Sequence, residues 1–121
     1  MKPELTELRE LRLEERELIR FLVTGMLPEE QINRSLTGAC ASDVRDGGMR
    51  SILFKGPAGR KMGAELVEAH YHDLDGVLVS ISVNLDTSGE LFELDFWKVD
   101  FSPLKKYPKC SEIVTKRRVQ P

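Results

Sequence analysis

The segment Gly76–Leu104 constrains the fold of this chain most strongly, because apolar and polar residues alternate on both sides of a turn at Asp86–Gly89. Successive side chains of a strand point to opposite faces of a sheet, so this period of two predicts a β-hairpin with one apolar and one polar face. In the first strand the apolar face consists of Val77, Val79, Ile81, Val83 and Leu85. In the second strand it consists of Phe92, Leu94 and Phe96.

The register of this hairpin follows from matching apolar residues across the turn, since a slip of one residue would move a whole strand to the other face. A two-residue loop, Thr87-Ser88, pairs Val83 with Phe92, Ile81 with Leu94 and Val79 with Phe96. The preceding turn, Asp73–Gly76, fits a three-residue loop that ends in a left-handed glycine. It pairs Tyr71 with Val79, Ala69 with Ile81 and Val67 with Val83. Three strands thus present apolar side chains to one face.

The first part of the chain, about residues 5–36, is predicted to be helical. Apolar residues recur there at helical spacing, so an amphipathic helix covers at least Glu14–Thr24 and ends at Gly25. A short second helix runs from about Pro28 to Leu36, with Ile32 and Leu36 on one face.

Turn residues at regular spacing divide the next part, about residues 39–101, into strands. The five predicted strands are Cys40–Arg45, Met49–Lys55, Ala64–His72, Val77–Leu85 and Glu90–Phe101. The last segment, 102–121, contains three prolines and no apolar periodicity, so we expect an irregular course over the surface. The prediction is an α+β fold in two layers: one or two N-terminal helices packed on a roughly five-stranded, mainly antiparallel meander sheet.

Length and charge limit the classes of protein to which the chain can belong. Its 121 residues suit a single domain, 1–121, with a substantial core. The net charge is −2 and the one basic cluster is Lys116–Arg118, so we expect no nucleic-acid partner. The chain shows neither a signal peptide nor an apolar stretch long enough to span a membrane, which favours a cytoplasmic protein without a membrane partner. Cys40 and Cys110 are then expected to be free thiols.

The polar face of the predicted sheet gathers the candidate functional side chains. With the register above, its rows are His70, Ser80 and Asp95; Glu68, Ser82 and Glu93; and His72, Leu78 and Trp97. Imidazole and carboxylate groups bind divalent metals and act as general acids or bases, so this face is a candidate metal site. Its candidate ligands are His70, His72, Asp95 and Glu93. An open sheet also exposes polar side chains for solvation alone.

The only tryptophan, Trp97, marks a candidate partner-binding surface on the same face. Exposed aromatic clusters are typical of interfaces. The candidate contacts are Trp97, Leu78, Glu93 and Asp95, and further apolar neighbours would be Leu91, Val99 and Phe101. The alternative is that the C-terminal segment, through Leu104 and Tyr107, folds back and covers the tryptophan.

No segment carries a catalytic signature. The loop Lys55–Lys61 contains glycines and cations but lacks the GxxxxGK[ST] spacing of a phosphate-binding loop, which indicates a mobile loop. No serine lies in a GxSxG motif, and neither cysteine has an identified base. We therefore predict no catalytic residue and no cofactor, and interpret the chain as non-enzymatic.

Three segments resemble those of a known family: Asp46–Ile52 (DGGMRSI), Asp73–Val77 (DLDGV) and Leu91–Leu104 (LFELDFWKVDFSPL). They follow an N-terminal segment, Arg12–Ile19, that fits the same pattern. Over about residues 11–108 the chain resembles a family of small, uncharacterised bacterial proteins that share a domain of unknown function. The resemblance implies a bacterial origin and a self-contained domain, and it implies no catalytic or binding residues.

The leading hypothesis is a small, non-enzymatic bacterial binding protein that uses the polar sheet face around Trp97 to contact a protein partner. The alternative is a small metal-binding protein or metal-dependent enzyme that uses the histidine and carboxylate cluster on the same face. A third possibility is a homodimer formed through an exposed strand edge, since nothing in the sequence closes the sheet into a barrel.

Overall fold

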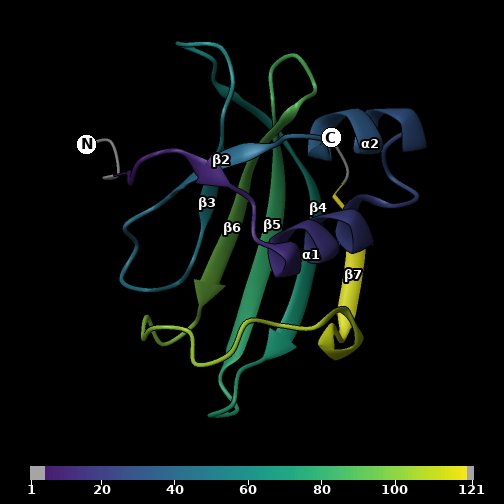
Figure 1. The fold of residues 1–121 in the computed structure, drawn as a ribbon. Helices are drawn as coiled ribbons and strands as arrows, with labels where there is room; N and C mark the ends of the chain where they lie inside the picture. The colour runs from purple at the N-terminus through teal and green to yellow at the C-terminus, as the bar shows by residue number, and fades with distance from the viewer. Residues whose placement is uncertain (1–4, 120–121) are drawn as a thin grey trace.

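The computed structural model describes residues 5–119, which form two helices packed on a seven-stranded antiparallel sheet (Figure 1). The helices are α1 (Leu13–Val23) and α2 (Glu29–Leu36), and a short 3-10 helix, η1, spans Cys110–Glu112. The strands are β1 (Arg9–Glu10), β2 (Cys40–Asp43), β3 (Ile52–Phe54), β4 (Met62–His72), β5 (Leu78–Asp86), β6 (Leu91–Lys98) and β7 (Thr115–Arg118). The predicted α+β class is confirmed, but the predicted strand number of five is wrong.

The order of strands across the sheet is β1-β2-β3-β6-β5-β4-β7, and every neighbouring pair is antiparallel. The β2–β3 pair and the β4–β5–β6 meander agree with the prediction. However, β3 pairs with β6 rather than with β4, so the chain is not one continuous meander. This pairing places Ile52 beside Leu94, and both side chains are fully buried.

Two edge strands, β1 and β7, were not predicted. They contain two and four residues, and neither shows an apolar alternation. Backbone hydrogen bonds hold such short edge strands, so the side-chain pattern does not reveal them. The expected irregular course of residues 102–121 is therefore wrong for η1 and β7.

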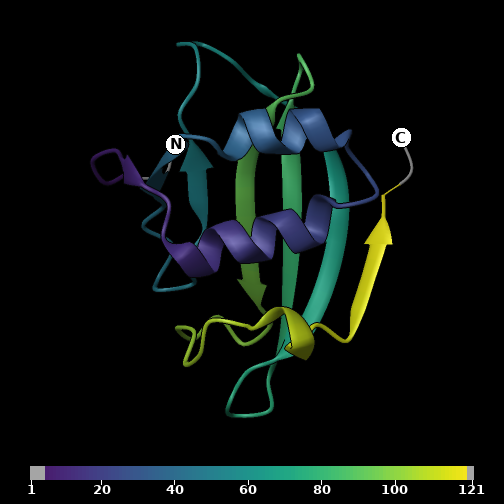
Figure 2. The ribbon, with the colours of Figure 1, turned by 45° about the vertical axis from the view of Figure 1, so that its right-hand side comes forward.

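Both helices lie across one face of the sheet, as Figure 2 shows. The predicted helices are confirmed: α1 ends two residues before Gly25, whose φ of 85° is the left-handed conformation of a helix stop. Helix α2 buries Ile32 and Leu36, as predicted. Helix α1 buries Leu18, Ile19, Leu22 and Val23 against the sheet. In residues 5–119, no helix combines the length and the apolar character that crossing a membrane requires.

The register between β4 and β5 is the predicted one. Tyr71 pairs with Val79, Ala69 with Ile81 and Val67 with Val83. The turn at Asp73–Gly76 closes as a three-residue loop, in which the Gly76 amide donates to the Asp73 carbonyl and Gly76 has a φ of 78°.

The predicted register between β5 and β6 is wrong by two residues. Val83 pairs with Leu94, Ile81 with Phe96 and Val79 with Lys98. A pairing irregularity between Asn84 and Leu85 accounts for one residue of this shift, and the other comes from the turn, which has three loop residues instead of two. Asp86 organises it, because its Oδ1 accepts hydrogen bonds from the amides of Ser88 and Glu90 at 2.9 and 3.0 Å. A shift of an even number of residues preserves the faces, so the buried face of β5 is as predicted.

A bulge after the turn reverses the predicted faces of Leu91 and Phe92. Leu91 joins the core, whereas Phe92 turns to the other face and lies under the Arg60 guanidinium, 4.9 Å from the ring centroid. An irregularity in strand pairing of this kind re-aims side chains, and the apolar pattern alone does not locate it.

The last core position of β6 is occupied by Lys98, which is fully buried. Its ammonium donates to Asp73 at 2.9 Å, to Asp75 at 2.7 Å and to the Pro103 carbonyl at 3.2 Å. This cluster ties the β4–β5 turn to the end of β6 and to the segment that follows it. A buried lysine with three acceptors is fully compensated, so we assign it a structural role.

Candidate functional site

The sheet face that α1 and α2 leave uncovered carries the candidate site, and we call it the open face. The predicted residues of the polar face lie on it, but the two-residue shift of β6 changes the rows. His70 and Ser80 share a row with Trp97 instead of Asp95. The next rows are Glu68, Ser82 and Asp95, and then Glu65, Asn84 and Glu93.

Asp95 lies at the centre of the open face and is half-buried. Its Oδ1 accepts a hydrogen bond from the Ser51 hydroxyl at 3.1 Å, and the Ser51 oxygen in turn accepts from the Phe96 amide at 2.9 Å. Burial, followed by repulsion from Glu93, raises the pKa of Asp95 to about 6. The surroundings of Asp95 therefore disfavour its charged form, and a positive charge placed beside it would stabilise that form.

Three further carboxylates surround Asp95, and each is held through one oxygen. Ser82 donates to Glu65 at 2.6 Å, Asn84 donates to Glu93 at 2.9 Å, and Arg117 donates to Glu68 at 3.3 Å. The second oxygen of each of these glutamates has no hydrogen-bond partner in the described part of the chain. The open face therefore presents hydrogen-bond acceptors with negative charge, which favours a cationic ligand.

Trp97 lies at one end of the open face with 48% of its surface exposed. It packs edge-to-face against Phe101, with ring centroids 4.9 Å apart, and Phe101 and Val99 are exposed as well. The alternative that the C-terminal segment covers Trp97 is wrong: Leu104 is buried in the core, and the Tyr107 ring packs on Phe96, which faces the helices. Leu91 is not part of this apolar patch, because the bulge places it in the core.

The predicted metal ligands share the open face but do not converge. His70 is on β4 and Asp95 on β6, with β5 between them. The His70 Nδ1 is 2.8 Å from the Thr115 hydroxyl, and its Nε2 is 3.6 Å from Glu68. Within residues 5–119, no three or more His, Cys, Asp and Glu side chains are grouped so that they could hold a metal ion.

The terminal basic cluster is engaged within the protein itself. Lys116 donates to the carbonyls of Phe21 and Thr24 at the end of α1, at 2.6 and 3.3 Å. Arg117 pairs with Glu68, and Arg118 donates to the Met26 carbonyl at 3.0 Å. Cys40 and Cys110 are free thiols.

Two residues of the open face, Ser51 and Glu65, were missed at the level of sequence. Ser51 becomes a neighbour of Asp95 only because β3 pairs with β6, which the pattern did not predict. Strict alternation from Glu68 would turn Glu65 toward the core, but a pairing irregularity between Glu65 and Val67 turns it to the open face. No local signal in the sequence marks either position.

A family model described as a domain of unknown function (DUF6984) matches residues 8–108. The matched segment contains α1, α2 and β1 to β6, and thus the carboxylates of the open face and Trp97. Neither the curated proteins nor the solved structures include a match to this chain.

Proposed function

The chain belongs to the family of the domain of unknown function DUF6984, and we propose that it is a non-enzymatic binding protein whose open face receives a positively charged segment of a protein partner. The single observation that carries this proposal is the half-buried Asp95 among three other carboxylates, beside the half-exposed Trp97. The partner class follows from the charges of the face.

Charge complementarity favours a basic ligand. The three rows that contain Trp97, Asp95 and Glu93 carry four carboxylates on β4 and β6, and the cation that borders them on β7 is Arg117. A lysine or arginine of a partner would satisfy the second oxygens of the glutamates with charge-assisted hydrogen bonds. Complementary potentials also accelerate association and suppress acidic competitors.

Trp97 supplies the anchor that fixes the position of such a segment. A tryptophan face attracts guanidinium and ammonium groups, by about 0.5–1 kcal/mol when the pair is exposed and about 2 kcal/mol when it is desolvated. Tryptophan is also enriched among the residues that contribute most to interfaces. An arginine or lysine side chain stacked on Trp97 has acidic groups one and two rows away along the sheet.

Asp95 links this binding to pH. A cation beside the carboxylate lowers its pKa, so the basic segment and a proton compete for the same group. Because burial and Glu93 raise the pKa of Asp95 to about 6, binding is expected to be tighter at pH 7.5 than at pH 5. The pH effect should be smaller in Asp95→Asn, whose side chain at this position does not titrate.

The test is selection of random dodecapeptides displayed on phage against the purified protein at pH 7.5. We expect the selected peptides to be enriched in arginine and lysine. A selected peptide carrying a fluorescent label should lose about thirtyfold in affinity on Trp97→Ala, which corresponds to about 2 kcal/mol. Emission from Trp97, the only tryptophan, reports directly whether the unlabelled peptide reaches this residue.

Leu13→Ala is the matched control, because Leu13 is an exposed apolar side chain at the start of α1, on the helical layer. It should leave peptide affinity unchanged, and both variants should keep the thermal midpoint of the wild type within a few degrees. Selection of peptides without basic enrichment would contradict the proposal. Equal affinities of Trp97→Ala and Leu13→Ala would contradict it as well.

A further inference from the structure

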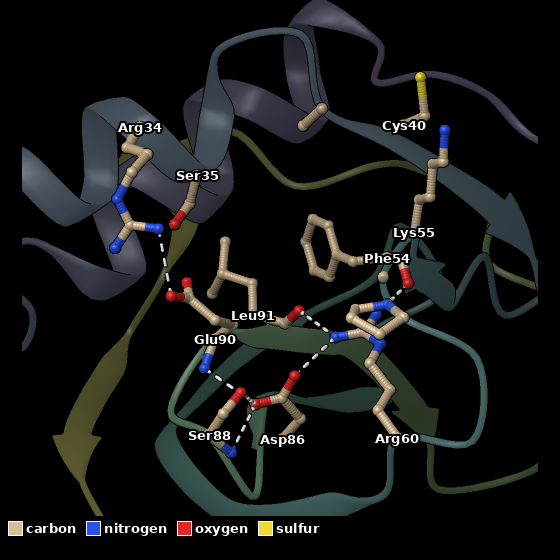
Figure 3. A pocket seen from close by; sticks show the side chains of 13 residues that line it. Arg34, Ser35, Cys40, Phe54, Lys55, Arg60, Asp86, Ser88, Glu90 and Leu91 are labelled. Atoms are coloured by element: carbon tan, nitrogen blue, oxygen red, sulfur yellow. Dashed lines mark hydrogen bonds and ion pairs between the residues drawn. The ribbon is translucent and has the colours of Figure 1, made fainter.

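A pocket of about 260 Å³ lies away from the open face, where α2 meets the loop Lys55–Lys61 and the β5–β6 turn (Figure 3). Its apolar lining comes mainly from Phe54 and Leu91, and its polar lining comes from Arg34, Ser35, Lys55, Arg60, Asp86, Ser88 and Glu90. The volume is at the small end of ligand pockets, so a ligand of only a few heavy atoms fits.

Two of the three cations in the lining are already neutralised. Arg60 donates to Asp86 at 3.1 Å and to the Leu91 carbonyl at 2.9 Å, and it also bonds the Phe54 carbonyl. Arg34 pairs with Glu90 at 3.1 Å. The Lys55 ammonium group has no ion pair or hydrogen bond in residues 5–119, so it carries the uncompensated positive charge of the pocket.

The Ser35 hydroxyl is the second polar group of the pocket that a ligand would satisfy. Its oxygen is buried and has no hydrogen-bond partner in the described part of the chain. A buried hydroxyl without a partner destabilises the folded protein, and a ligand that bonds it removes this cost. Ser35 lies on α2, and Lys55 follows β3, so the two groups approach the pocket from different elements.

The arrangement of these groups defines the ligand. Figure 3 shows Arg34 and Ser35 on one side of the pocket and Lys55 on the other, with Phe54 and Leu91 between them. A ligand that satisfies the lining is therefore polar at both ends and apolar in the middle, with a negative charge at the Lys55 end.

We propose that this pocket binds a small carboxylate with a flat or compact apolar body and a hydroxyl group opposite the carboxylate. The carboxylate pairs with Lys55, the body lies on Phe54 and Leu91, and the hydroxyl hydrogen-bonds Ser35. None of these residues belongs to the three rows of the open face that contain Trp97, Asp95 and Glu93.

The test uses 4-hydroxybenzoate as the probe, added to ¹⁵N-labelled full-length protein and followed by amide chemical shifts. Two related molecules separate the two polar ends: 4-hydroxybenzamide lacks the negative charge, and benzoate lacks the hydroxyl. We expect 4-hydroxybenzoate to shift amides around Ser35, Cys40 and Phe54 and to bind at least about tenfold more tightly than 4-hydroxybenzamide, as one charge-assisted hydrogen bond predicts.

Variants then assign the contacts. Lys55→Gln should weaken 4-hydroxybenzoate about tenfold, whereas Lys61→Gln, in the same loop but outside the pocket lining, should not. Ser35→Ala should abolish the preference for 4-hydroxybenzoate over benzoate. The amide spectrum of each variant shows whether it is folded. Shifts that map elsewhere, equal binding of the amide, or equal effects of Lys55→Gln and Lys61→Gln would each overturn the proposal.

Discussion

At the scale of single residues, β6 carries two ionisable groups in opposite electrostatic environments. Lys98 points to the core, where burial lowers its pKa, but the hydrogen bonds to Asp75 and Asp73 outweigh burial and raise the pKa overall. Asp95 points to the open face and receives one hydrogen bond, from Ser51, while Glu93 repels it. A buried charge that is paired with opposite charges, such as Lys98, favours a structural role. A half-buried charge without an opposite charge beside it, such as Asp95, favours a functional role.

Asp95→Asn is expected to stabilise the protein at pH 7.5 by about 1–2 kcal/mol, because it removes a half-buried charge and keeps an acceptor for Ser51. The folded pKa of about 6 is above the unfolded value of 3.8, so the folded state binds more protons between these values. Wild-type stability therefore decreases as pH rises from about 4 to about 7 relative to the variant, and urea unfolding at a series of pH values measures the difference.

The control for this substitution is Asp100→Asn, which removes an exposed carboxylate whose pKa is lowered by the Ser102 hydroxyl and amide. It should give no gain in stability at pH 7.5. A loss of stability in Asp95→Asn at that pH would show that its charge is compensated after all.

At the scale of elements, β7 joins the two layers. It pairs with β4 along the sheet edge, from Thr115 beside His70 to Arg118 beside Val67. Its Lys116 bonds two carbonyls at the C-terminal end of α1 and lies over the Phe21 ring at 4.8 Å. Helix carbonyls at this end have no partners within the helix, so a cation from the neighbouring strand both satisfies them and complements the helix dipole.

Lys116→Met should lower the free energy of unfolding by about 1 kcal/mol, because the ammonium bonds to α1 are lost while the apolar stem still covers Phe21. Chemical denaturation with a fixed m-value measures this loss. Lys105→Met, which changes an exposed lysine in the same C-terminal segment, should alter stability by less than about 0.5 kcal/mol. Equal effects of the two substitutions would mean that β7 does not hold α1.

At the scale of the whole molecule, ion pairs around the sheet connect segments that are distant in sequence. Asp86 pairs with Arg60, Asp73 with Lys98, and Asp43 with Arg9. The pKa of each of these carboxyl groups is lowered: Asp43 chiefly by Arg9, Asp86 chiefly by Ser88, and Asp73 by hydrogen bonds from the Lys105 amide and Lys98 that outweigh its burial.

The stability of the whole domain should therefore fall steeply in acid. Each lowered pKa contributes stability that is present above the ordinary value near 4 and is lost as pH falls toward the folded value. We expect the free energy of unfolding to decrease continuously from about pH 4 to pH 2, in 1 M salt as well, because buried pairs are screened less than exposed ones such as Arg20–Glu29. A constant urea midpoint between pH 5 and pH 2 would contradict this expectation.

Local patterns predicted a large part of this fold. The apolar face of β5, the β4–β5 register, both helices and the glycine stop after α1 all depend on residues close together in sequence, and all are confirmed. The residues of the open face, including Trp97 and Asp95, followed from the same period of two. Their rows were wrong by two residues, since hydrogen bonds to Asp86 lengthen the β5–β6 turn by one residue and the bulge after the turn adds the second.

The sequence by itself determined which face of each central strand is buried, because a strand alternates its side chains whatever lies beside it. The hairpin at Gly76–Leu104 thus predicted an apolar face and an acidic face carrying the tryptophan. Only the tertiary structure decided which strands are neighbours, where pairing irregularities turn Phe92 and Glu65 outward, and how Ser35 and Lys55 come to line one pocket. These outcomes depend on backbone hydrogen bonds and packing between distant segments, which produce no periodic pattern in the sequence.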